Sequence, residues 1–267
     1  MVQSWFREKS LFIVSSTILG FLMLLFLILP IINTVSTSAG GLGEAITTAE
    51  TVNAILTSFF AAYLATLITF FFGVPLAYTL ARHEFKGKSL VDAVIDLPIL
   101  IPHNAAGISL LMLLGPRSLI GGGFSSLGVS FVDTIFGVVA AMVFVSSPFM
   151  IRSAEEAFKS VNPELEKVAR SLGASTFNAF KNVTFPLAFR GILTGCLLTW
   201  ARSISEFGAV VVLAYYPKTA AVHLYDVFVN WGLSAAAPIT ALLIILAVTI
   251  FTVIKLITAK PLKPSFS

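Results

Sequence analysis

The chain has 267 residues, of which 57% are hydrophobic and 11% charged, with a net charge of +4 and a mean hydropathy of +0.95. An average soluble domain carries about 25% charged residues, so the composition excludes an ordinary soluble enzyme or a basic nucleic-acid-binding domain. The apolar residues are gathered in long runs, which predicts an all-α polytopic membrane protein.

Six runs are long enough to cross a bilayer, which takes about 20 residues per helix. They are residues 11–33, 52–81, 92–114, 134–151, 187–213 and 233–257. The first run is longer than the core of a signal peptide, roughly 7–15 residues. We therefore expect an uncleaved first span, although Ser-Thr-Ser-Ala-Gly-Gly after it could mimic a cleavage site. Pro75 predicts a kink in the second span.

The distribution of Lys and Arg predicts the topology. Fourteen of the seventeen fall in the N-terminus, the second-to-third loop, the fourth-to-fifth loop and the tail, and the opposite side has only Arg117 and Lys218. The positive-inside rule then places both termini in the cytoplasm. We expect three parts, with residues 1–51 as cytoplasmic segment, first span and external loop, 52–257 as the main transmembrane domain, and 258–267 as a cytoplasmic tail.

The third span begins with an unusual pair of prolines. Pro98 and Pro102 lie one turn apart, so backbone hydrogen bonds are missing at two levels and a bend is expected. Irregular backbone at membrane depth must be packed in protein or line a cavity, so a structural kink and a pore-facing segment both stay open. Asp92 and Asp96 lie near the expected start of the helix, where the helix dipole favours negative charge.

The segment 162–186 is the only long polar stretch between strongly apolar runs. Asn162 suits an N-cap and Pro163 a first helical position, and Gly173 suits a left-handed C-terminal cap. Ser175 can cap a second short helix, which Pro186 would end or kink. An apolar stripe is expected from Leu165, Val168, Ala169 and Leu172. Two interpretations fit this stripe: a helix in the lipid headgroup region, or a helix that docks in a groove of a partner protein.

The fifth span contains Arg202 and Glu206, which are four residues apart and can pair on one helix face. Charges inside a membrane are costly unless paired or hydrated, and usually face a bundle interior or a cavity. One interpretation makes this face, with Trp200, Ser203 and Phe207, a pore lining. The other is an ion pair that locks two helices together.

Several apparent sites fail on inspection. Gly87-Lys88-Ser89 resembles the end of a phosphate-binding loop, but Arg82 occupies the position of the earlier glycine. Residues 121–123 are three glycines in an external loop, where a flexible turn is expected. Cys196 is alone and can form neither an intrachain disulfide nor a zinc site. We expect no catalytic residue, no metal site and no cofactor bound by this chain.

The polar segment resembles the cytoplasmic loop signature of ATP-binding-cassette importer permeases, which reads E-A-A, three residues, Gly, nine residues, I-x-L-P. Gly173 and the Val-Thr-Phe-Pro ending at Pro186 fit this spacing, but the E-A-A position reads Lys-Val-Ala, and Glu166 stands one place early. In that family the segment is the coupling helix that seats on the ATPase subunit. The resemblance assigns this contact to Glu164, Leu165, Glu166, Val168, Ala169, Arg170, Leu172, Gly173 and Ala174.

Two further motifs resemble the molybdate, tungstate and sulfate permeases. They are Leu-Pro-Ile-Leu-Ile-Pro at residues 97–102 and Ser-Glu-Phe-Gly at residues 205–208. In many of these permeases a second Pro takes the place of His103, which here is either a satisfied interfacial histidine or a weak pH-sensitive or oxyanion-contacting group. We expect the translocation pathway or its gate at Pro98, Pro102, Arg202, Ser203, Glu206, Phe207 and Gly208.

The resemblance implies a six-helix type I importer transmembrane fold with the coupling helix between the fourth and fifth spans. It implies a permease subunit for molybdate or tungstate in the cytoplasmic membrane of a bacterium or archaeon. The implied partners are a second copy, two cytosolic ATPase subunits that use the ATP, an extracytoplasmic oxyanion-binding protein and membrane lipid. The alternatives are a sulfate or thiosulfate importer permease, a secondary transporter that works without an ATPase, and an intramembrane enzyme.

Overall fold

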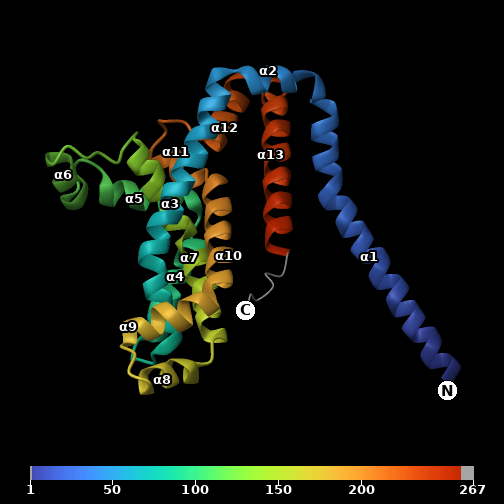
Figure 1. Cartoon of the computed structure of the whole chain (residues 1–267). Coiled ribbons are helices and arrows are strands. Elements are labelled where there is room, and N and C mark those ends of the chain that lie inside the picture. The colour runs from blue at the N-terminus through green and yellow to red at the C-terminus, as the bar shows by residue number, and fades with distance from the viewer. Residues whose placement is uncertain (1, 260–267) are drawn as a thin grey trace. The chain divides into compact units, whose positions relative to one another are not determined.

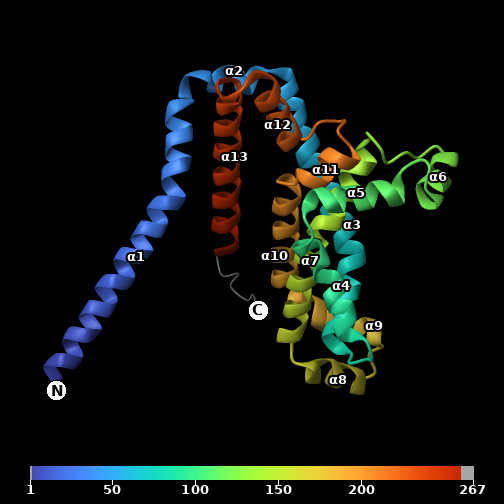
Figure 2. The same ribbon diagram turned by 180° about the vertical axis from the view of Figure 1, so that it is seen from behind.

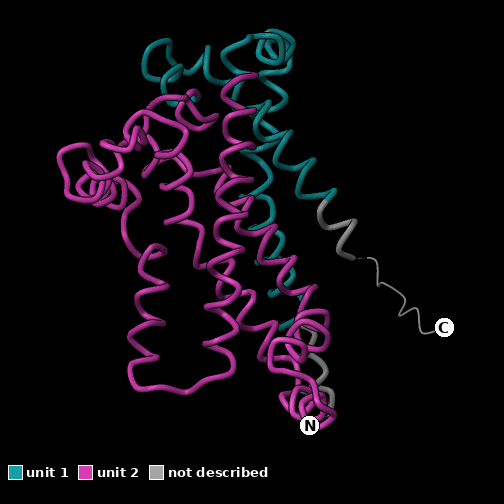
Figure 3. Tube along the Cα trace, turned by 60° about the vertical axis from the view of Figure 1, so that its left-hand side comes forward, with its two compact units in different colours: residues 1–51, 224–267 teal, residues 52–223 magenta. Residues whose placement is uncertain are grey.

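The computed structural model describes residues 2–259, and over that range the chain forms helices joined by short connections (Figures 1 and 2). The chain divides into two compact units, shown in Figure 3. Unit 1 contains residues 1–51 and 224–267, and unit 2 contains residues 52–223. Each unit has its own packing.

Unit 2 is a bundle built around one long helix, α7 (Ile135–Ser160). Its other elements are α3 (Ala49–Arg82), α4 (Lys88–Leu100), α5 (His103–Leu114), α6 (Leu119–Ser126), α8 (Pro163–Ser171), α9 (Thr176–Ala179), the π-helical turn η2 (Phe180–Thr184), α10 (Phe185–Ile204), α11 (Gly208–Leu213) and α12 (Ala220–Trp231). Helix α3 begins in unit 1, and α12 ends there. Helices α10, α11, α4 and α5 all pack against α7. The buried face of α7 therefore organises this unit.

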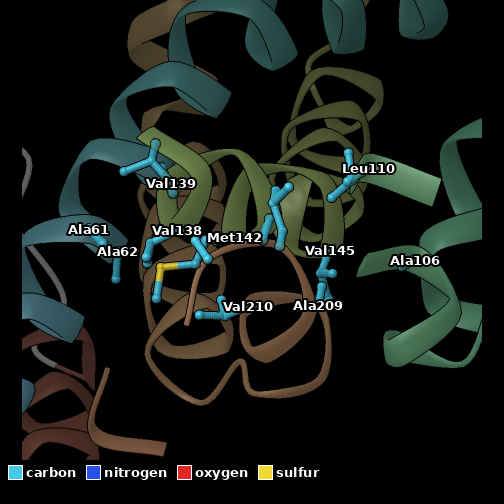
Figure 4. Close-up of a cluster of buried hydrophobic side chains, with 14 of the residues drawn as sticks. Ala61, Ala62, Ala106, Leu110, Val138, Val139, Met142, Val145, Ala209 and Val210 are labelled. Atoms are coloured by element: carbon cyan, nitrogen blue, oxygen red, sulfur yellow. The ribbon is translucent and has the colours of Figure 1, made fainter. Parts of the chain in front are cut away.

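Small and branched side chains fill the interior of unit 2. In one cluster, Val138 and Met142 of α7 meet Val210 of α11 and the alanines of α3 (Figure 4). A second cluster lies toward the C-terminal half of α7, where Phe158 is fully buried beside residues of α3 and α10. Lipid is as apolar as these side chains, so helix association here depends on close packing rather than on exclusion of water.

Unit 1 contains α1 (Val2–Thr37), the 3₁₀ turn η1 (Ala39–Gly41), α2 (Leu42–Thr47) and α13 (Leu233–Ala259). The most apolar stretch of α1 lies within residues 12–37, and none of it is buried within the chain. An apolar helix without a polar face is suited to a membrane interior. The surface of α1 is thus available to lipid or to another membrane protein.

Five of the described helices are long and apolar enough to cross a membrane, or six spans if α4 and α5 count as one bent span. The prediction of a six-span helical fold is confirmed. Two spans are interrupted: the helix direction bends by 113° between α4 and α5, and a break at residues 205–207 separates α10 from α11. The bend after Pro102 was expected, whereas the fifth span was expected to be continuous. Residues 260–267 of the predicted tail lie outside the described residues.

Two local expectations are wrong. The glycines at 121–123 lie inside α6 rather than in a turn, because Ser118 caps this helix by accepting a hydrogen bond from Gly121 N at 2.8 Å. Helix α4 begins at Lys88, after Gly87 with φ +94°, so Asp92 and Asp96 lie beyond its first turn. The short helix that Ser175 caps, α9, is followed by the π turn η2 directly before Pro186, so the regular helix is interrupted there as expected.

Candidate functional site

Helix α8 has the end structures that the sequence predicts. The side chain of Asn162 accepts a hydrogen bond from Glu164 N at 3.0 Å, and Pro163 occupies the first helical position. Gly173 has φ +95°, and the amides of Gly173 and Ala174 bond the carbonyls of Arg170 and Ala169. This pair of bonds is the Schellman arrangement, which satisfies the last carbonyls of a helix. The helix is therefore fixed at both ends by local sequence.

The predicted apolar stripe of α8 points away from the chain. Leu165, Val168 and Leu172 are exposed, Leu172 by 84%, and Phe177 in α9 is 68% exposed. Lys167 and Glu164 form an exposed ion pair at 2.7 Å on the same helix. Four large apolar side chains on neighbouring short helices form a surface patch, and such patches mark interaction sites. We call these four residues the α8–α9 patch.

Glu166 faces the opposite way, toward the spans of its own chain. Its Oε1 accepts hydrogen bonds from Arg82 Nε and from Thr184 Oγ1, both at 2.7 Å. Its Oε2 accepts a third from Tyr78 Oη at 3.0 Å. The carboxylate thus joins α8 to the C-terminal end of α3 and to η2, residues far apart in the sequence.

These contacts change the acidity of Glu166. Partial burial alone raises the pKa of a carboxyl group, but hydrogen bonds from Thr184, Arg82 and Tyr78 and the positive charge of Arg82 lower it by more. The net result is a pKa below the ordinary value of 4.5. Glu166 is therefore a carboxylate at neutral pH, which is the form that these three donors require.

The π turn places Thr184 against Glu166. In η2, Phe185 N bonds Phe180 O, one residue further back than in an α-helix. Pro186 follows at the start of α10, and a proline ring in a regular helix clashes with the carbonyl four residues earlier. Wider π turns are found at such positions and frequently at functional sites. The Thr and Pro of the Val-Thr-Phe-Pro motif thus have separate structural roles.

The two helix breaks of unit 2 meet at a polar cluster. His103 begins α5 directly after the bend, and its Nδ1 lies 2.7 Å from Glu206 Oε2. Arg202 Nη2 donates to the same oxygen at 2.9 Å and lies 2.9 Å from His103 Nδ1. Glu206 Oε1 accepts from Ala209 N at 2.9 Å, which caps α11. We call His103, Arg202 and Glu206 the break cluster.

Burial differs sharply within the break cluster. The side chain of Glu206 is 1% exposed, whereas those of Arg202 and His103 are 23% and 35% exposed. A buried carboxylate needs a partner, and here it has a guanidinium, an imidazole ring and a backbone amide. The cationic and imidazole groups are the members that a solute could contact.

Two glycines allow the broken helices to approach closely. A Cβ atom on Gly208 would lie 2.6 Å from both Asn104 Oδ1 and His103 Cβ. One on Gly107 would lie 2.9 Å from Ala209 O and 2.8 Å from Val212 Cβ. Real Cβ atoms essentially never come within 3.0 Å of such neighbours. Both positions therefore require glycine for α5 to pack on α11 as it does.

The other residues predicted for the pathway are not members of the break cluster. Ser203 is fully buried and donates to Ser146 Oγ of α7 at 2.9 Å, so it faces the bundle. Pro98 is buried within α4, whereas Pro102 is exposed at the bend. Trp200 packs edge to face on Phe59, with ring centroids 5.4 Å apart, and Phe207 is half-buried. The structure brings together Arg202, Glu206, Gly208 and His103, and not the remainder.

Sequence reasoning missed the role of Arg152. This arginine of α7 donates two parallel hydrogen bonds to Asp96, at 2.9 and 2.8 Å, one to Asp92 at 2.7 Å and one to Glu155 at 2.7 Å. Lys159 adds a contact to Glu155 at 2.8 Å. The four-residue spacing of Asp92 and Asp96 shows that they share a face, but no sequence signal identifies a partner 56 residues away. This cluster attaches α4 to α7.

The carboxylates of this cluster are occupied by Arg152 rather than free for a metal ion. Among the residues whose side chains are described, no group of three or more His, Cys, Asp or Glu is arranged as a possible metal site.

Relatives of this chain are membrane transport proteins. It is 45% identical over 204 residues to the molybdate/tungstate transport system permease protein WtpB of Thermococcus kodakarensis, covering 76% of this chain and 77% of that protein. It is 39% identical over 257 residues to WtpB of Pyrococcus abyssi, covering 95% and 98% of the two chains. A probable sulfate transport system permease of Chlorokybus atmophyticus is 43% identical, but over only 57% of this chain and 54% of that protein.

The fold matches a solved importer. A bacterial ABC transporter that imports the acidic polysaccharide alginate has a TM-score of 0.68 and 18% identity, covering 93% of this chain and 97% of the other. This likeness shows the type I importer transmembrane fold. Residues 73–259 match the family described as binding-protein-dependent transport system inner membrane component. The chain belongs to this family of ABC importer permeases, whose members are non-catalytic membrane subunits.

Proposed function

We propose that this chain is the permease subunit of an ATP-driven importer that carries molybdate or tungstate across the cytoplasmic membrane. The observation that carries the proposal is the α8–α9 patch, an exposed apolar surface on a capped helix between two spans. The WtpB relatives, which are named for molybdate and tungstate, support the substrate class. No cofactor is assigned to this chain, and ATP is used by separate partner subunits.

Helix α8 acts as the coupling helix, which docks in a groove of an ATPase subunit. Fully burying one leucine contributes about 1.5–3 kcal/mol, so the four side chains of the patch can supply substantial binding energy. Arg170 and the Glu164–Lys167 pair border this surface with exposed charges. A polar rim around an apolar centre is typical of protein interfaces.

The break cluster lines the translocation pathway or forms part of its gate. Interrupted helices at membrane depth are typical of transport sites, because their backbone groups must face protein or a water-filled cavity. Arg202 supplies positive charge, which a dianion requires, and Glu206 offsets it. The site is then nearly neutral, so it attracts an oxyanion weakly and allows its release.

The complete transporter contains two copies of this chain, two cytosolic ATPase subunits and an extracytoplasmic oxyanion-binding protein. The family description supports the dependence on a binding protein. The unburied apolar surface of α1 supports contact with lipid and with a second copy. Both termini and α8 lie in the cytoplasm, in accord with the excess of Lys and Arg on that side.

Reconstitution in proteoliposomes tests this function. The chain is purified with its ATPase and oxyanion-binding protein, and uptake of radiolabelled molybdate, tungstate and sulfate is measured with and without ATP. We expect uptake of molybdate and tungstate that needs ATP, the ATPase and the binding protein. Transport by the chain alone would indicate a secondary transporter, and preferential uptake of sulfate would overturn the substrate assignment.

A further inference from the structure

We propose that Glu166 is a positioning residue that ties the coupling helix α8 rigidly to α3 and η2, so that movement of the ATPase reaches the spans. The inference rests on the proposed function, because it presumes that α8 docks on an ATPase. It gives Glu166 a role inside this chain instead of at the interface. The resemblance to the importer signature had assigned Glu166 to the interface.

The direction of the side chain separates Glu166 from its neighbours. Its side chain is 16% exposed, whereas those of Glu164 and Lys167 are 64% and 68% exposed. It receives donors from α3 and from η2, at distances of 2.7–3.0 Å. A carboxylate has about four acceptor positions, and donors of its own chain use three of those of Glu166, so it has little capacity left for contact with another protein.

Arg82 extends the attachment to the beginning of α8. Its Nε binds Glu166, and its Nη2 donates to the carbonyl of Val161 at 3.0 Å, one residue before the N-cap Asn162. Both the start and the middle of α8 are therefore held by one guanidinium at the end of α3. Helix α8 cannot tilt away from α3 without breaking these charged hydrogen bonds, which are stronger than neutral ones.

The donors are themselves firmly placed. The ring of Tyr78 packs edge to face on Phe158 and Phe180, with centroids 5.4 and 4.8 Å apart. Thr184 is fully buried and directly precedes α10. A displacement of α8 is thus passed through Glu166 to the half-buried Tyr78 on α3 and to the beginning of α10. Because the large apolar side chains of α8 are on its outer side, the polar contacts of Glu166 are what attach the helix to the rest of the chain.

The test compares Glu166→Gln with Glu84→Gln in the complete transporter in proteoliposomes. Glutamine keeps the shape, and its one carbonyl oxygen can still accept from Thr184 in the position of Oε1. It loses the charge that binds Arg82 and turns an NH2 group toward the hydroxyl of Tyr78. Glu84 is a matched control, because its side chain is 87% exposed and pairs with Lys88, at 2.6 Å. Substrate carried per ATP hydrolysed and association with the ATPase are measured for both variants.

We expect Glu166→Gln to associate with the ATPase as the unaltered protein does. It should carry about tenfold less substrate per ATP, because a hydrogen bond to a charged group contributes a free energy that corresponds to about this factor. Glu84→Gln should behave normally. Tyr78→Phe, which removes only a hydroxyl group, should reduce the ratio less but in the same direction.

An unchanged ratio of substrate to ATP in both Glu166→Gln and Tyr78→Phe would overturn the proposal. Loss of ATPase association in Glu166→Gln, with normal thermal stability, would also overturn it, because Glu166 would then act at the interface. These outcomes differ from failure of the proposed function, in which the unaltered chain itself shows no ATP-dependent transport.

Discussion

The guanidinium of Arg152 binds the carboxylate of Asp96 through two parallel hydrogen bonds, from Nε to Oδ1 at 2.9 Å and from Nη2 to Oδ2 at 2.8 Å. This fork geometry is specific to arginine, because lysine offers a point charge without a planar pair of donors. The same guanidinium reaches Asp92 and Glu155. One side chain of α7 thereby fixes the half of the third span that precedes the bend.

Arg152→Lys should therefore loosen α4 although it keeps the charge. The lysine cannot bind both oxygens of Asp96 and also reach Asp92, so we expect a loss of about 1–2 kcal/mol, limited by the partial exposure of the pair. Thermal unfolding of the purified protein measures the loss. Arg117→Lys is the control, because Arg117 is exposed and forms no ion pair with the described residues. Equal unfolding temperatures for the two variants would contradict this role.

The lowered pKa of Glu166 predicts a pH dependence of stability. Because the pKa in the folded chain lies below the ordinary value of 4.5, the carboxylate contributes its full stabilisation above that value. The contribution is lost as the pH falls through the folded pKa. The difference in stability between the unaltered protein and Glu166→Gln should thus be constant near neutral pH and shrink below pH 4.5. If this difference in stability grew on acidification, the pKa of Glu166 would be raised in the folded chain and not lowered.

Local features of the structure could be predicted from the sequence, because they depend on neighbouring residues. The caps at Asn162 and Gly173 are set by backbone conformations that Asn and Gly adopt most easily. The bend at Pro102 follows from the missing amide. The break after Arg202 has no such signal, since Ser205 and Phe207 do not interrupt helices. It is stabilised by tertiary contacts, of which the bond from Ala209 N to Glu206 is one.

Long-range contacts explain the remaining differences. Glu166 was expected at a partner interface because of the resemblance to the importer signature, and helical periodicity alone cannot tell whether a polar residue between apolar ones faces inward. Its partner Tyr78 is 88 residues away. The three glycines that begin at Gly121 were expected to form a flexible turn because of their composition. Ser118 instead caps a helix that contains them. Ser203 was assigned to the same helix face as Arg202, whereas its hydroxyl group faces Ser146 across the bundle.

The α8–α9 patch predicts the effect of a charge at its centre. Leu172→Asp should abolish association with the ATPase, because burying an unpaired carboxylate in an apolar groove costs several kcal/mol. Membrane insertion should be retained, since residue 172 lies outside the spans. Leu119→Asp on α6 is a matched control, because Leu119 is 98% exposed and lies outside the patch. Co-purification of the ATPase measures the effect, and an unchanged yield with Leu172→Asp would refute the docking surface.

Substitutions of Gly173 test whether coupling requires the left-handed cap at the C-terminal end of α8. Its φ of +95° is strained for a β-branched residue, so Gly173→Val should disturb the end of the helix and reduce transport per ATP. Gly173→Asn should be tolerated much better, because asparagine adopts left-handed conformations more readily. Equal coupling in the two variants would show that this cap is not required.

The break cluster predicts a difference between single and double neutral variants. Arg202→Gln leaves the carboxylate of Glu206, which is 1% exposed, with only His103 and the amide of Ala209. Removing one partner of a buried pair costs about 3–5 kcal/mol, so this variant should unfold at a lower temperature. Glu206→Gln should cost less, because its amide oxygen can still accept from Ala209 N and Arg202 keeps access to solvent.

The double variant, Arg202→Gln with Glu206→Gln, separates a pore role from a purely structural pair. Two glutamines can hydrogen-bond each other, and residue 206 can still cap α11, so assembly and unfolding temperature should recover toward those of the unaltered protein. If the pair lies on the pathway, transport of the dianion should stay low, because the positive charge that draws it into a low-dielectric pore is gone. A stably assembled double variant that transports molybdate at the rate of the unaltered protein would show that Arg202 and Glu206 serve only to hold the broken helices together.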